Sequence, residues 1–190
     1  MSATPIDTPA RRPRWGLWAT AAVLAALLGL LAAGMTRDPR ELPSVRIGKP
    51  WPAMVLPQLD DPAPLDPAQW RGQARIVNLW ASWCSSCREE HPALMALAAE
   101  LRAQGRGGQL IGLNYKDRTA DAQAFLQRLG NPFSTSVVDA DGRLGIELGV
   151  YGAPETYVID ARGLILYRHV GPLTPEVIRT QLLPRLKDGA

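Results

Sequence analysis

The sequence contains few residues that bind metals or form disulfides. Of its 190 residues, two are cysteines and two are histidines. Two cysteines cannot form the framework of several bridges that stabilises small secreted domains. A tetrahedral zinc site needs four ligands, so it would have to use both cysteines and both histidines, His91 and His169. Haem attachment through a C-x-x-C-H motif is excluded, because Arg88 follows the second cysteine.

The chain also lacks a strong excess of either charge. Its formal net charge is +3, and the part beyond residue 35 carries 18 basic and 17 acidic residues. Binding to nucleic acid would require a basic patch, so we expect no nucleic-acid partner. The sequence shows neither internal repeats nor low-complexity segments, and its length suits one domain with an accessory segment.

Charged residues are absent from the 21 residues 15–35. As a helix they would span about 31 Å, which matches a hydrocarbon core of about 30 Å. This run is longer than the apolar core of a cleaved signal, so we predict an uncleaved transmembrane anchor. Cleavage near Ala32-Ala33 is the alternative, and Arg11-Arg12 gives a weak hint of a twin-arginine signal.

Positive charge precedes this span, at Arg11, Arg12 and Arg14. The positive-inside rule therefore predicts that residues 1–14 are a cytoplasmic tail and that everything past Met35 lies outside the cytoplasm. The polar, proline-bearing residues 36–45 are predicted to be a linker. Residues 46–190 then form the globular domain.

The two cysteines lie two residues apart, in Cys84-Ser-Ser-Cys87. So short a ring stabilises a fold by roughly 2 kcal/mol, against about 4.7 kcal/mol for a 100-residue loop. The pair therefore suits a bridge that is made and broken. An apolar strand, residues 75–80, precedes it, and a helix with one apolar face follows.

This placement puts Cys84 at a strand-to-helix turn, where free N–H groups and the helix dipole favour a thiolate. Cys87, one turn further along, is predicted to be the shielded partner. Such a pair performs thiol–disulfide exchange, in which one cysteine attacks a disulfide and the other resolves the mixed disulfide. Glu90 lies three residues after Cys87, on the same helix face, where a carboxylate can take a proton from the resolving thiol. The alternative is a solvated first-turn glutamate.

The remaining elements alternate in type. The pattern βαβαβ, followed by a β-hairpin and a helix, predicts an α/β fold with a mixed sheet covered on both faces. The expected strands are 75–80, 110–113, 137–138, 156–159 and 164–169, with helices after Cys84, near 119–129 with Thr119 as a possible cap, and from Pro175 until Pro184 kinks or ends the last one.

Four stretches narrow this pattern to a family. They are Asn78–Pro92, Gly112–Asp117, Gly149–Thr156 (Gly-Val-Tyr-Gly-Ala-Pro-Glu-Thr) and Tyr167–Gly171. Together they resemble the membrane-anchored thioredoxin-like reductases of cytochrome c maturation, called CcmG or DsbE. The resemblance extends from about residue 47 to residue 186. One departure is Ser85-Ser86, where members of this family commonly carry a proline between the cysteines.

The resemblance implies a thioredoxin-like fold and a redox-active Cys84–Cys87 pair that needs no other cofactor and no metal. It implies a cis Pro154 in a loop facing the dithiol, with Glu155 lining the same groove. Trp83 is implied to be the indole that precedes the dithiol, although a plain core aromatic is the alternative. His91 is predicted to be structural.

The resemblance also implies partners and a location. The dithiol would be a reductant in the periplasm, anchored by one span in the inner membrane. A transmembrane thiol reductase of the DsbD/CcdA kind would supply its electrons. Apocytochrome c, or a thiol protein dedicated to cytochrome maturation, would accept them.

Three alternatives remain at this level. A general extracytoplasmic disulfide reductase has the same dithiol and a broader set of substrates. A thiol peroxidase on the same fold would attack peroxide with one cysteine. A copper-delivery module would use both cysteines and a distant histidine such as His169, although such proteins space their cysteines by three residues rather than two.

Overall fold

A computed structural model of the chain describes residues 15–35 and 46–188. The chain divides into two compact units, Met1–Leu42 and Pro43–Ala190. In the first unit, α1 spans Trp15–Met35. Among the residues that are described, we find no helix both long and apolar enough to cross a membrane. The anchor therefore stays a prediction, and the predicted tail (1–14) and linker (36–45) lie outside the described residues.

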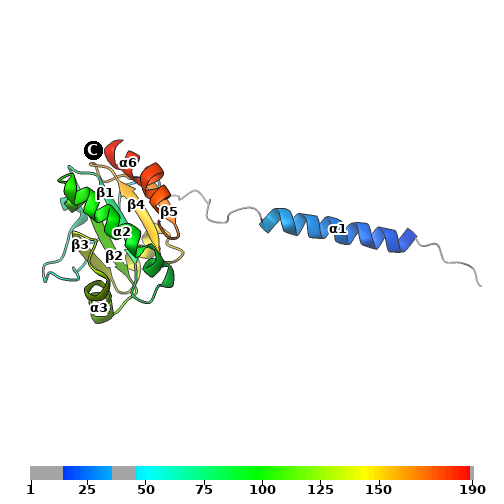
Figure 1. Ribbon diagram of the computed structural model, residues 1–190, viewed down its shortest axis with the longest axis horizontal. Helices are drawn as coiled ribbons and strands as arrows, with labels where there is room; N and C mark the ends of the chain where they lie inside the picture. Colours follow the sequence, from blue (N-terminus) through cyan, green and yellow to red (C-terminus); the bar gives the residue numbers. More distant parts are fainter. Residues whose placement is uncertain (1–14, 36–45, 189–190) are drawn as a thin grey trace, which may run out of the picture. The chain divides into compact units, whose positions relative to one another are not determined.

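The second unit is built on a five-stranded mixed sheet with the order β3-β2-β1-β4-β5 (Figure 1). The strands β1, β2 and β3 are parallel to one another. Strand β4 runs antiparallel to β1, and β5 runs antiparallel to β4. This is the predicted α/β arrangement with a β-hairpin after it. The strand bounds are β1 Arg75–Trp80, β2 Leu110–Tyr115, β3 Thr135–Asp139, β4 Glu155–Ile159 and β5 Ile165–Val170.

Helices and loops cover both faces of the sheet. The bounds are η2 Pro67–Trp70, α2 Ser85–Ala103, η3 Gly107–Gln109, α3 Thr119–Leu129, α4 Arg143–Leu148, α5 Pro175–Val177, the π-helical segment η4 Ile178–Leu182 and α6 Leu183–Asp188. One core layer packs α2, α3 and the C-terminal helices on Ile76 and Trp80 of β1. The other packs α4 and the segment before β1 on Val77 and Leu79 of the same strand. Successive residues of a strand thus point into different layers.

The structure differs from the predicted elements at two places. Helix α4 was not foreseen; it is short, and the carboxylate of Asp139 accepts the N–H groups of Leu144 and Gly145 near its start. The prediction of Thr119 as a helix cap is wrong, because α3 begins at Thr119 and Arg118 occupies the cap position. Of the two outcomes predicted at Pro184, a kink or an end, the structure excludes the end, because α6 (Leu183–Asp188) continues through it.

The C-terminal helix instead passes through a π-helical segment, η4, immediately before α6. The N–H of Leu183 bonds to the carbonyl of Ile178, five residues earlier. A proline removes one N–H and crowds the preceding turn, and the wider π turn accommodates Pro184 within a continuing helix.

Candidate active site

The dithiol lies where β1 ends and α2 begins. Cys84 is the N-cap residue of α2, with φ −84° and ψ 117°. Its Sγ accepts the backbone N–H of Cys87 at 3.0 Å, and the two cysteines form a disulfide. An N–H aimed at Sγ favours the thiolate of Cys84 after reduction. Exposure distinguishes the two cysteines little, since Cys84 is 5% and Cys87 2% exposed.

The loop before β4 faces the dithiol. The carbonyl oxygen of Ala153 lies 3.4 Å from Cys84 Sγ. The Ala153–Pro154 peptide bond is cis, as the sequence resemblance implies. Because Ala153 and Pro154 come immediately before β4, which pairs with β1, the sheet itself brings this loop to the cysteines.

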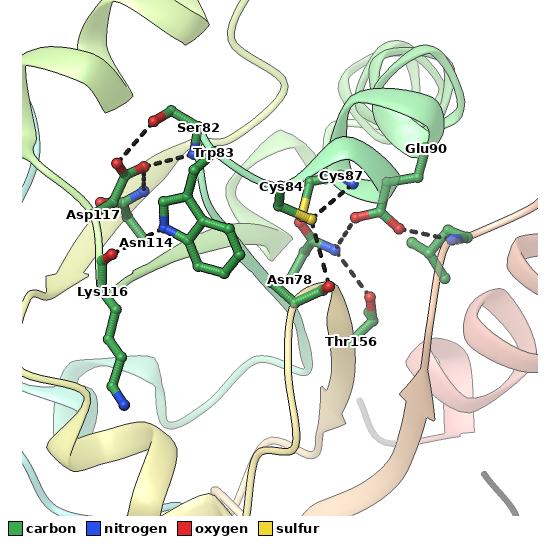
Figure 2. Close-up of a disulfide and its surroundings, with 12 residues drawn as sticks. Asn78, Ser82, Trp83, Cys84, Cys87, Glu90, Asn114, Lys116, Asp117 and Thr156 are labelled. Atoms are coloured by element: carbon green, nitrogen blue, oxygen red, sulfur yellow. Dashed lines mark hydrogen bonds between the residues drawn. A yellow bond between two sulfur atoms is a disulfide. The ribbon is translucent and has the colours of Figure 1, made fainter. Parts of the chain in front are cut away.

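Trp83 is not a core aromatic, because 57% of it is exposed. Its indole Nε1 donates to the carbonyl of Lys116 at 2.9 Å, so the ring is fixed by the loop that follows β2. The neighbouring Ser82 is bound to Asp117 of the same loop. Figure 2 shows this group on one side of the dithiol and Glu90 on the other. Sequence reasoning gave Ser82 and Asp117 no role, although both lie in the stretches that carry the family resemblance.

Glu90 points from α2 into the protein and is 1% exposed. Its two carboxylate oxygens accept hydrogen bonds from the Asn78 side-chain amide at 2.9 Å and from the Leu173 backbone N–H at 2.7 Å. Burial raises the pKa of Glu90 to about 7, although these two hydrogen bonds favour its charged form. The solvated alternative is therefore wrong: Glu90 is a buried carboxyl that changes protonation near neutral pH, one turn from Cys87 on the same helix.

Asn78 connects Glu90 to the sheet. The same side-chain amide also donates to the hydroxyl of Thr156 on β4, at 3.0 Å. Asn78, Glu90 and Thr156 are all buried, and Figure 2 shows them beneath the first turns of α2. The sequence alone did not single out Asn78, because a polar residue inside an apolar strand has no evident role until its hydrogen-bond partners are known.

The prediction that Glu155 lines the groove is wrong. Glu155 is fully buried, and its carboxylate forms an ion pair with Arg168 at 2.7 Å while accepting the Tyr157 hydroxyl. It also accepts the backbone N–H of Tyr151. Side chains alternate along a strand, so Glu155 and Tyr157 face the layer away from α2, whereas Thr156 faces Glu90.

Each of the two histidines has a ring nitrogen close to a backbone carbonyl. His91 is buried, lies edge-on to Phe125 and has Nε2 at 3.1 Å from the Gly130 carbonyl. Burial lowers the pKa of His91. His169 has Nε2 at 3.3 Å from the Pro172 carbonyl. Within residues 15–35 and 46–188 there is no group of three or more His, Cys, Asp or Glu side chains placed to hold a metal ion.

The family model described as Redoxin matches residues 46–182. The thiol:disulfide interchange protein DsbE of Pseudomonas aeruginosa is 49% identical over 155 residues, which cover 81% of this chain and 83% of that protein. DsbE of Escherichia coli is 44% identical over 166 residues, or 86% of each chain. The chain belongs to the CcmG/DsbE family of thioredoxin-like proteins.

A solved structure agrees with the CcmG/DsbE assignment. A Chlorobium tepidum protein assigned as a thiol:disulfide interchange protein DsbE has a TM-score of 0.64 and 29% identity, covering 74% of this chain and 97% of that one. The chain is accordingly a thiol:disulfide oxidoreductase with a thioredoxin-like fold. The disulfide between Cys84 and Cys87 fits the redox-active pair of such an enzyme.

Proposed function

We propose that this protein is a membrane-anchored reductant outside the cytoplasm that keeps the haem-binding cysteines of apocytochrome c, or those of a dedicated thiol partner, reduced. The main structural support is that the two cysteine sulfurs have different neighbouring groups. Cys84 Sγ accepts an N–H at the start of α2, and Cys87 lies on the same buried helix face as Glu90. Family membership supports a thiol partner at each end of the electron path.

The reaction transfers two electrons from the Cys84–Cys87 dithiol to the substrate disulfide. The Cys84 thiolate attacks one sulfur of the substrate disulfide, forming a mixed disulfide and releasing one substrate thiolate, which takes up a proton. The Cys87 thiol then loses its proton to Glu90 and attacks Cys84 Sγ. The second substrate thiol leaves with a proton, the protein carries the Cys84–Cys87 disulfide, and the substrate has gained two electrons.

The electrons must then be replaced from outside the protein. We propose a transmembrane thiol reductase of the DsbD/CcdA kind as the donor, because the extracytoplasmic location requires electrons to cross the membrane. The uncharged residues 15–35 and the arginines that precede them support a single span with the domain outside. A reporter that is active only in the cytoplasm, fused after Ala190, is expected to be silent; activity there would contradict this topology.

A trapping experiment tests the partner assignment. In the full-length chain, Cys87→Ser should accumulate a mixed disulfide through Cys84, because only an outside thiol can then release it. Non-reducing gels and mass spectrometry would identify the captured protein. An apocytochrome c or its dedicated thiol partner would support the proposal, whereas a broad set of exported proteins would indicate a general reductase.

The matched control is Cys84→Ser, which should capture nothing. Capture by Cys84→Ser together with none by Cys87→Ser would show that the attacking and resolving cysteines are exchanged. Peroxide consumption by the wild-type chain at a rate above its disulfide reduction would favour a thiol peroxidase.

A further inference from the structure

The loop after β2 holds the segment that leads into the dithiol. The carboxylate of Asp117 accepts the backbone N–H of Ser82 at 2.6 Å and the Ser82 hydroxyl at 2.8 Å. It also accepts the side-chain amide of Asn114 at 3.0 Å and the N–H of Arg118 at 2.9 Å. One carboxylate therefore takes four donors, two of them from Ser82, which lies two residues before the attacking cysteine.

The same loop fixes the residue between Ser82 and Cys84. The Trp83 indole N–H bonds to the carbonyl of Lys116. Lys116 has φ +45°, and among the described residues it is the one non-glycine with a positive φ. A left-handed backbone at such a residue persists only where its surroundings hold it, so the loop is built in one conformation with this carbonyl turned towards Trp83.

The sheet explains why these two loops meet. β1 and β2 are parallel neighbours, with Trp80 opposite Asn114, so their C-terminal ends lie at the same edge. The chain leaving β1 then turns, with the N–H of Cys84 bonded to the Ala81 carbonyl at 3.2 Å, and enters α2. In this turn Cys84 Sγ meets the N–H of Cys87 at 3.0 Å.

We propose that Asp117 is a positioning residue for thiol–disulfide exchange: it holds Ser82 so that Cys84 enters α2 in the N-cap geometry that stabilises its thiolate. The proposal rests on Cys84 as the attacking thiol, as argued above. Figure 2 shows Asp117 on the far side of Trp83 from the sulfurs, so it acts through the backbone rather than on the reacting atoms.

Positioning and simple charge predict opposite effects. A nearby negative charge disfavours a thiolate, so removing Asp117 would shift the reactivity of Cys84 to lower pH if its charge were what mattered. If Asp117 acts by positioning, its removal weakens the contact between Cys84 Sγ and the N–H of Cys87, and reactivity shifts to higher pH. The sign of the shift separates the two.

The experiment measures the rate at which iodoacetamide alkylates Cys84 in the reduced, detergent-solubilised full-length chain from pH 4 to pH 10. For Asp117→Ala we expect the midpoint of the rate profile to move upwards by about one pH unit, the size expected for loss of an N-cap contact. Asp117→Asn keeps an oxygen for the backbone N–H of Ser82 and the Asn114 amide, and its own amide can donate to the Ser82 hydroxyl. Although the exposed N–H of Arg118 loses its acceptor, both contacts to Ser82 remain, so the midpoint should stay close to that of the wild type.

Two further variants complete the test. Asp121→Ala removes an equal charge from an exposed carboxylate in the next helix, which pairs with Arg118 at 3.6 Å, and should leave the midpoint unchanged. Ser82→Ala removes one donor, should shift the midpoint upwards by less than Asp117→Ala, and serves in its place if that variant does not fold.

Three results would overturn the proposal. The first is an unchanged midpoint with a lowered Tm in Asp117→Ala, which would make the residue merely structural. The second is a midpoint moved to lower pH in Asp117→Ala. The third is an equal shift in Asp121→Ala. Reduction of a disulfide by Cys84→Ser would instead refute the proposed role of Cys84, and so identifies a failure of the underlying assignment separately.

Discussion

Replacing Glu90 with glutamine removes the ionisation of a buried carboxyl, and the consequence for stability can be calculated with its sign. Burial raises the pKa of Glu90 from an ordinary 4.5 to about 7. The folded protein therefore holds this proton more tightly than the unfolded chain does. The stability that the neutral carboxyl contributes is fully present below about pH 4.5 and is lost as the pH rises through 7.

The size of this loss follows from the shift. A difference of about 2.5 pH units corresponds to roughly 3 kcal/mol, at about 1.4 kcal/mol per unit. Glutamine cannot ionise, so the free energy of unfolding of Glu90→Gln relative to the wild type should rise by roughly 3 kcal/mol between pH 4.5 and pH 8. Glutamine has one acceptor oxygen for the two donors from Asn78 and Leu173, and this costs about 1 kcal/mol at every pH.

The assay is urea unfolding of the full-length chain, followed by tryptophan fluorescence from pH 4 to pH 9. The protein is kept in its disulfide form so that neither cysteine titrates. His91, whose pKa is lowered by burial, is present in both proteins and its titration cancels in the difference. A difference that stays constant over this range would refute the argument that burial penalises the charged form of Glu90.

Two further predictions concern the layer behind the site and the sheet itself. Arg168→Met should lower the free energy of unfolding by about 3–5 kcal/mol, because it leaves the Glu155 carboxylate buried without its cation; adding Glu155→Gln should recover most of the loss in urea unfolding, and no recovery would show that the ion pair is not the cause. Gly112→Ala should cost about 1–3 kcal/mol, because a Cβ there would overlap the Trp80 indole and its neighbours. Gly152→Ala, where that space is empty, should change stability by less than about 0.5 kcal/mol, and equal losses in the two variants would contradict the packing argument.

The secondary structure of the domain was largely predictable, because its apolar residues repeat with clear periods. The strand at 75–80 and the helix after Cys84 were foreseen from such patterns, and so was the hairpin near the end. Helix α4 was not, because its six residues are too few to show a helical period and glycines stand at both caps, Gly142 and Gly149. Its stability comes from Asp139 and from burial of Leu144 and Leu148, which are tertiary effects.

The site was predictable only where spacing along the chain is sufficient. Cys84, Cys87 and Glu90 lie on one helical turn after another, so the sequence itself places them together. Asp117 contacts Ser82 across 35 residues, and this contact depends on the loops at the ends of two parallel strands. That these loops meet follows from the topology, but which side chain reaches across depends on the conformation at Lys116.

Glu90 and Glu155 are both buried carboxyl groups, but their surroundings differ. Both are essentially inaccessible to solvent, at 1% and 0% exposure. Glu155 forms an ion pair with Arg168 at 2.7 Å. The Glu90 carboxylate accepts from two neutral donors, Asn78 and Leu173, and desolvation raises its pKa to about 7. We therefore assign the proposed proton transfer from Cys87 to the face of the sheet that α2 covers.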